Sequence, residues 1–199
     1  MLSRHLARFA KHCKQRKALQ AVLGKKWYGG LKMDNRKDKD NYYLDIADAV
    51  LQRAPCIRRK YGAIIVRNDE IISTGYNGAP RGRKNCPDLG QCLRDALEIP
   101  SGERYELCRS VHAESNAIIS AARSEMIGAT LYLAGRDSKT NEYLSDTSPC
   151  MMCRRLIINA GITKTICRVS EDRYIVYQTR DWVFNDDSIM EMPVITTNT

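Results

Sequence analysis

Long hydrophobic runs are missing from this chain of 199 residues. A membrane-spanning helix needs about 20 consecutive apolar residues, and segments such as GAIIV and LIINAGI fall well short of that length. The N-terminus also lacks the apolar core of a secretory signal. We therefore expect a cytoplasmic protein without membrane contact, long enough to bury its own core as one domain.

Acidic residues are absent from residues 1–32, which carry nine of the 32 lysines and arginines. The remainder holds 23 basic and 23 acidic residues, so the net charge of +9 belongs to this first segment. We interpret residues 1–32 as a basic N-terminal extension, flexible or non-native, with Met33 as the alternative start. A targeting peptide and a basic docking arm are the other interpretations. Residues 33–199 would form the globular domain.

Phenylalanine and tryptophan are scarce, with two of each in the whole chain. Proteins that bind single strands stack bases on aromatic rings and follow the backbone with a positive groove. Because the part after residue 32 is also neutral, we do not expect a nucleic-acid partner.

The first half of the chain predicts a helix, a hairpin and a long loop. Apolar residues recur at helical spacing over 41–52, with Asp40 as the expected N-cap. Two β-branched runs flank Asn68 and Asp69, which is typical of a β-hairpin. Residues 77–110 show little periodicity, and a loop of that length is usually functional or tied to a metal.

The second half alternates helices and strands. We expect helices at 112–123 and 149–161, a small hairpin within 134–148, and an acidic, frayed tail after the last strand. The expected strands are ATLYL, TKTICRV and RYIVYQT. This order predicts a three-layer α/β domain, with helices on a mixed sheet.

Two short motifs carry the chemistry. Cys150 and Cys153 in PCMMC lie three residues apart in the first turn of a helix, where the helix dipole stabilises thiolates. His112 begins the other helix. Two sulfurs and one nitrogen would leave a fourth zinc position for water, whose pKa zinc lowers from about 15.7 towards 7. Glu114 would then move protons, whereas a redox pair or a closed structural zinc site would not need this acid.

A histidine and a glutamate in HAE, followed by PCxxC, are the signature of zinc nucleobase deaminases. GAIIVRNDEIISTGYNGAPRG, CRSVHAESNAIISAAR and PCMMCRRLIINAGI resemble the deoxycytidylate (dCMP) deaminases over about residues 40–170. The resemblance implies a cytidine-deaminase-like fold, a mixed five-stranded sheet sandwiched by helices. It also implies hydrolysis of dCMP to dUMP, with Glu114 protonating N3 and then the departing amine.

The resemblance suggests further site residues. Asn77 of GYNG matches a residue that holds the sugar, and Arg123 matches an arginine linked to nucleotide phosphate or regulator binding. From the residues alone, Asn77 is a good turn residue and Arg123 a solvated cation. Ala113 is a third candidate for substrate binding.

A second zinc site is the interpretation of four further cysteines. The resemblance places a structural zinc at Cys56 and Cys86, and we infer that Cys92 and Cys108 complete a closed four-sulfur shell. The alternative is a set of buried, inert thiols. We therefore expect two zinc ions in each chain.

One difference from the family pattern leaves the identity of the substrate undecided. About 15 residues, 134–148, stand where family members pass almost directly from strand to PCxxC, and they could reshape the pocket or an oligomer contact. A deaminase of cytidine, of another nucleotide or of a modified base is thus the alternative, and a non-catalytic zinc-stabilised module the third hypothesis. The resemblance also implies a homo-oligomer, a hexamer or a dimer.

Overall fold

The computed structural model describes residues 36–100 and 102–185, so the expected extension at 1–32 lies outside the described residues. Five strands form one sheet in the order β2-β1-β3-β4-β5. Only β3 and β4 pair in parallel, and the other neighbours are antiparallel. The strands are β1 (Arg59–Arg67), β2 (Glu70–Tyr76), β3 (Thr130–Asp137), β4 (Lys164–Arg168) and β5 (Tyr174–Gln178). The predicted mixed five-stranded sheet is confirmed.

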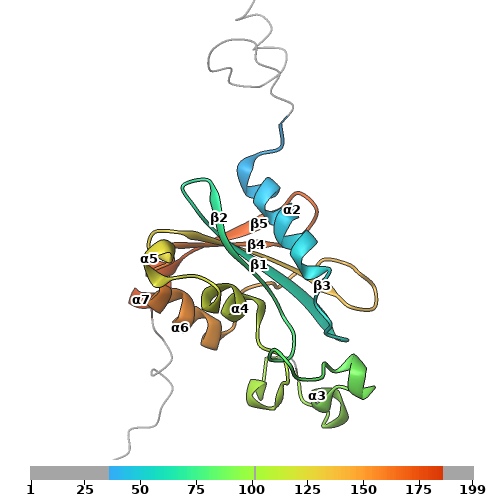
Figure 1. The fold of residues 1–199 in the computed structure, drawn as a ribbon. Helices are drawn as coiled ribbons and strands as arrows, with labels where there is room; N and C mark the ends of the chain where they lie inside the picture. The colour runs from blue at the N-terminus through green and yellow to red at the C-terminus, as the bar shows by residue number, and fades with distance from the viewer. Residues whose placement is uncertain (1–35, 101, 186–199) are drawn as a thin grey trace, which may run out of the picture. The chain divides into compact units, whose positions relative to one another are not determined.

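Helices cover both faces of this sheet, which confirms the three-layer prediction. Helix α2 (Lys39–Leu51) lies on one face, whereas α4 (Ala113–Ile119) and α6 (Met151–Ala160) lie on the other (Figure 1). Strand β1 divides its side chains accordingly, because successive residues point to opposite faces. Ala63 and Ile65 pack with α4 and α6, and Ile64 and Val66 pack with α2.

The β1–β2 hairpin forms where the sequence predicts it. Asn68 and Asp69 both have positive φ, 52° and 70°, as two-residue hairpin turns of this hand require. Its far end continues into Asn77, the first residue of the long loop.

The N-cap of α2 is Asp38 rather than the predicted Asp40. The Asp38 carboxylate accepts a hydrogen bond from the Asn41 amide at 3.0 Å. Asp40 lies inside the first turn and accepts one from the Tyr132 hydroxyl at 2.8 Å. Both residues suit a helix start, and the side chain of Asp40 contacts the sheet instead of capping the helix.

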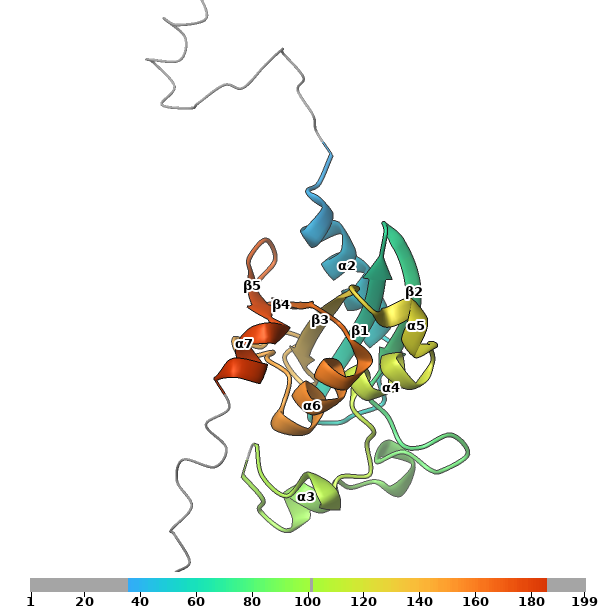
Figure 2. The same cartoon turned by 90° about the vertical axis from the view of Figure 1, so that its left-hand side faces the viewer.

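Two helical predictions need correction. The expected helix 112–123 ends at Ile119, and a separate turn, α5 (Arg123–Met126), follows. The expected frayed tail instead begins with helix α7 (Thr179–Phe184), shown beside α6 in Figure 2. Trp182 of α7 lies with its ring centre 5.3 Å from the Arg154 guanidinium of α6. Helix α7 thus makes a tertiary contact with α6, and local sequence propensity does not reveal such a contact.

The long loop contains only single turns, as expected of residues 77–110. These are the 3-10 turns η1 (Pro87–Leu89) and η2 (Tyr105–Leu107) and the helical turn α3 (Leu93–Ala96). They lie together at one end of the molecule, beyond the start of α4 (Figure 1).

The segment 134–148 forms the expected small hairpin. Strand β3 runs to Asp137, and Tyr143 then bridges back to Arg136. The Arg136 guanidinium lies 3.8 Å from the Tyr143 ring centre and pairs with Asp48 of α2 at 2.7 Å. The hairpin is therefore tied to the α2 side of the sheet. In the described part of the chain, no helix is both long enough and apolar enough to cross a membrane.

Candidate metal centre and active site

The N-termini of α4 and α6 supply the candidate metal ligands. His112 and Cys150 are the N-cap residues, one position before the first turn in which the sequence analysis placed them. Cys153 is the third residue of α6. Helices α4 and α6 pack in the same core on one face of the sheet. The HAE and PCxxC motifs, 38 residues apart, therefore meet at adjacent helix ends.

The three ligand atoms have the spacing that zinc requires. His112 Nδ1 lies 3.4 Å from the sulfur of Cys150 and 3.4 Å from that of Cys153. Tetrahedral zinc with usual Zn–N and Zn–S bond lengths separates such a nitrogen and sulfur by about 3.6 Å. Among the described residues, these three form the one group of three or more potential ligands within 4.8 Å of one another. Their chemistry and spacing fit a zinc ion.

The two thiols differ in their protonation. A hydrogen bond from the Cys153 thiol and the neighbouring His112 together lower the pKa of Cys150 to about 4, against the effect of burial. The pKa of Cys153 is raised by the same hydrogen bond and by burial. One thiolate is therefore present without metal, at a helix N-terminus whose dipole favours it.

Glu114 is a buried acid beside this cluster. It is the second residue of α4, and its side chain is 5% exposed. Burial raises the pKa of Glu114 above its usual range, while the positive charge of His112 acts in the opposite direction. Proton-transferring carboxylates have such environments, because a raised pKa brings the group closer to neutral pH.

A cavity of about 960 Å³, including its open mouth, adjoins the cluster. Glu114, His112 and Cys150 line it, and so do the predicted Asn77 and Ala113. The structure thus brings the first motif, the second motif and the GYNG turn to one space.

The amide of Asn77 is held by the backbone of β1. Its oxygen accepts from the Tyr61 amide at 2.7 Å, and its nitrogen donates to the Arg59 carbonyl at 3.0 Å. These bonds fix Asn77 in the cavity wall. Ala113 is fully buried between His112 and Glu114.

Arg123 lies apart from the residues that line the cavity. It starts α5 and donates from Nε to the Asn159 carbonyl near the end of α6, at 2.9 Å. The described contact is structural, and a role in nucleotide or regulator binding stays a prediction.

The four cysteines of the predicted second zinc site all line the cavity. Burial raises the pKa of Cys86, and Cys92, Cys56 and Cys108 each raise it further, so the four thiols are neighbours. No three of them, however, have sulfurs within 4.8 Å of one another in the described structure. All seven cysteines in the described part are free thiols.

Tyr105 is a site residue that the sequence analysis missed. Its ring meets the His112 ring edge-on, with centres 4.9 Å apart, and it lines the cavity. The residue lies in the irregular loop, where no periodicity relates it to the HAE motif. Only the fold of the loop reveals this contact.

Of the 134–148 segment, Ser148 alone lines the cavity. The segment therefore adds little to the wall of the site.

Comparisons with known proteins agree with this geometry. Residues 37–169 match the model of the cytidine and deoxycytidylate deaminase zinc-binding region. A deoxycytidylate deaminase of Mycobacterium phage D29 is 38% identical over 136 residues, which cover 66% of this chain and 95% of the phage protein. One from Schizosaccharomyces pombe is 34% identical over 137 residues, 68% of this chain but only 38% of the yeast protein.

A dCMP deaminase from cyanophage S-TIM5, solved without ligand, is 28% identical, with a TM-score of 0.46 over 67% of this chain and 84% of that one. The family model covers most of the chain, including HAE, PCxxC and the intervening strand. The chain therefore belongs to the cytidine and deoxycytidylate deaminase family and has its zinc-binding domain.

Proposed function

We propose that this protein hydrolyses dCMP to dUMP and ammonia. The observation that carries the proposal is the meeting of one imidazole, two thiols and a buried carboxyl group at the wall of one cavity. Relatives named deoxycytidylate deaminase, in phage and in yeast, support dCMP as the substrate. We take the deaminase domain to begin at residue 33, close to residue 37 where the family match starts.

In this proposal, His112, Cys150 and Cys153 hold a zinc ion. Zinc with three protein ligands keeps a fourth position for water and lowers the pKa of that water towards neutrality. The helix ends hold all three side chains in place, so the ligand set needs little rearrangement to receive the ion.

Glu114 moves the protons of the reaction. It takes a proton from the attacking water and delivers it to N3 of the cytosine ring. This addition forms the C4–O bond. The same carboxyl group then moves the proton of the new C4 hydroxyl to the amine, and the C4–N bond breaks as ammonia leaves. Burial of Glu114 beside His112 supports this role, because the carboxyl group can act as both acid and base near neutral pH.

In the same proposal, Asn77 and Ala113, which line the cavity with Glu114, hold the substrate. The amide of Asn77 keeps one N–H and one lone pair free beyond its two backbone bonds, and these suit a sugar hydroxyl.

Ammonia release from dCMP, deoxycytidine, dCTP and CMP, measured side by side, tests the substrate. We expect the highest kcat/KM for dCMP. Faster ammonia release from one of the other three compounds would contradict this proposal and favour a deaminase of cytidine or of another nucleotide. No ammonia release from any of the four would also contradict it and would favour a modified base as substrate or a non-catalytic zinc module.

We also propose a structural zinc ion at Cys56, Cys86, Cys92 and Cys108. Their shared position around the cavity and their mutual effect on the Cys86 pKa support it. Loop movement would have to bring the four sulfurs together, and four thiolates would then close the shell. Free thiols in this number suit a reducing compartment such as the cytoplasm.

A homo-oligomer is the partner that the exposed surface suggests. Met152 and Leu156 on α6 and Ile119 at the end of α4 are all more than 40% exposed. An apolar area of this kind on neighbouring helices is typical of a subunit contact. Light scattering of the purified protein would measure the assembly.

A further inference from the structure

Ser115 joins the two helices that carry the candidate metal ligands. It is the third residue of α4, directly after Glu114, and its hydroxyl oxygen lies 3.8 Å from the Cys153 sulfur of α6. Ser115 is partly buried, and Cys153 is 1% exposed. Figures 1 and 2 both show α4 beside α6. This hydrogen bond therefore links the two helices next to the ligand cluster.

The hydroxyl of Ser115 differs from that of another serine on the same helix. A serine hydroxyl in a helix commonly donates to a carbonyl of the preceding turn. Ser120, at the end of α4, does so, and its hydroxyl donates to the Asn116 carbonyl at 2.8 Å. Among the described residues, the Cys153 sulfur is the one hydrogen-bond partner of the Ser115 side chain. The Ser115 hydroxyl is thus directed to a metal ligand instead of its own helix.

The two cysteine sulfurs have different donors. Cys150 precedes the first turn of α6, and the backbone amide of Cys153 donates to its sulfur. Cys153 lies inside the helix, where the Ser115 hydroxyl is the partner outside the ligand set that the described structure gives its sulfur. A metal-binding cysteine is a thiolate, which has lone pairs and no proton. Between Ser115 and Cys153, the hydroxyl must then donate and the sulfur accept.

Burial makes this donor important for Cys153. A buried charge is costly when it lacks a hydrogen-bond donor. Glu114 is also close enough to act electrostatically on Cys153, and two negative groups repel each other. The Ser115 hydroxyl offsets part of this cost and directs the sulfur. Groups that bond to metal ligands in this way orient them, and their loss typically weakens metal binding about 10- to 100-fold.

We propose that Ser115 is a positioning residue for the metal ligand Cys153 and that its hydroxyl strengthens zinc binding by donating to the thiolate. This inference rests on the proposed function, because the ion is the one that the proposed deaminase uses. Ser115 acts on the ion through Cys153, whereas Glu114 acts on the substrate. Two consecutive residues of α4 therefore support the two parts of the site, the metal centre and the proton transfer.

The zinc affinity of the Ser115→Ala variant, measured by competition with a chelator, tests this proposal without turnover. We expect zinc binding about 10-fold weaker than in the parent, because the lost donor is uncharged and its effect should be at the lower end of the usual range. Ser115→Thr keeps the hydroxyl and should keep the affinity. Ser120→Ala is the matched control, since it removes a hydroxyl of the same helix that bonds to backbone instead of a ligand.

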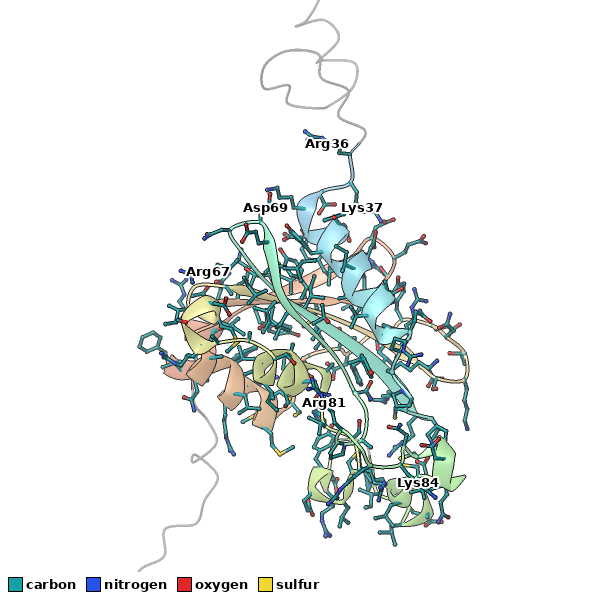
Figure 3. All side chains as sticks on the ribbon, viewed as in Figure 1. Arg36, Lys37, Arg67, Asp69, Arg81 and Lys84 are labelled. Carbon is teal, nitrogen blue, oxygen red and sulfur yellow. The ribbon has the colours of Figure 1, made fainter. Side chains whose placement is uncertain are left out.

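Cobalt(II) in place of zinc gives a second measurement. Its sulfur-to-metal charge-transfer absorption reports on the ligand sulfurs directly, and we expect this band to shift in Ser115→Ala but not in Ser120→Ala. Arg67→Gln controls for a general loosening of the α4 region. Arg67 donates to the Ser124 carbonyl of α5 at 2.8 Å, and Figure 3 shows Arg67 beside α5. Its loss should leave the cobalt spectrum unchanged.

Equal zinc affinities and equal cobalt spectra in the parent and in Ser115→Ala would overturn the proposal. An equal loss of affinity in Ser115→Thr would also overturn it, because the effect would then come from the shape of the side chain and not from its hydroxyl. A parent protein that binds neither zinc nor cobalt would contradict the proposed function itself, and this inference with it. The two failures are therefore distinguishable.

Discussion

Two sets of cysteines, one at helix ends and one in a loop, differ in how far the chain alone assembles them. Cys150 and Cys153 start α6 and meet His112 at 3.4 Å. Cys56, Cys86, Cys92 and Cys108 surround the same cavity, but no three of their sulfurs come within 4.8 Å of one another.

Regular secondary structure accounts for the difference. Backbone hydrogen bonds within α4 and α6, and the core between them, hold the first set in place before any ion binds. The loop contains only single turns, so the energy that would gather its sulfurs has to come from a metal. A catalytic centre needs ligands that are held in advance, whereas a structural ion can contribute to folding.

The Glu114→Gln variant removes the proposed proton-transferring group beside the cysteines at the helix ends. We expect kcat for dCMP to fall about 10²- to 10⁴-fold, the usual contribution of a general acid and base. Zinc content and unfolding temperature should stay unchanged, because Gln has nearly the same shape. Glu103→Gln, at an exposed loop residue, is the control. Retained turnover in the Glu114 variant would rule out its proton-transfer role.

The Cys86→Ser variant removes one of the four loop cysteines of the proposed structural zinc site. We expect metal analysis to find two zinc ions in the parent and one in this variant, with the remaining zinc at the helix ends. Because the loop cysteines line the same cavity as Asn77 and Glu114, KM for dCMP should rise as well. Cys167→Ser in β4 should keep both ions. A parent protein with one zinc ion would exclude the second site.

Gly75→Ala tests how tightly the preassembled region is packed. A Cβ at Gly75 would lie 2.3 Å from the Ala117 nitrogen and 2.4 Å from the Ala113 oxygen, both in the backbone of α4. Displacing α4 should lower the free energy of unfolding by about 1–3 kcal/mol, as overpacking generally does. Thr74→Ala, exposed on the same strand, is the control in urea unfolding. Equal stability of the two variants would contradict the close packing.

Asp38→Ala should have the smallest effect. Loss of the α2 N-cap lowers the free energy of unfolding by about 1 kcal/mol, and Asp38→Asn should restore most of it. Both variants should keep the parent's zinc content and turnover, because α2 lies on the sheet face opposite the site. A change in turnover would show that the two faces are coupled.

The local features of this fold follow from the order of residues. Alternating apolar residues in β1, two turn-forming residues at 68 and 69, and Gly161 after α6 all act over a few positions. The catalytic candidates were predictable for the same reason, since HAE and PCxxC each sit at a helix start.

Other features depend on contacts distant in sequence. Asp40 contacts Tyr132 of the distant strand β3, and α7 packs through Trp182 against Arg154. Tyr105 and Arg94 join the site through the path of an irregular loop, which has no periodicity to read.

The sequence by itself determined the family, the order of the elements and the residue types able to bind zinc and move protons, because helix starts and strand alternation are short-range effects. Only the tertiary structure decided that four arginines share the cavity with Glu114 and that no three of the loop sulfurs lie within 4.8 Å of one another. The physical reason is that an irregular loop takes its path from packing and hydrogen bonds with distant segments.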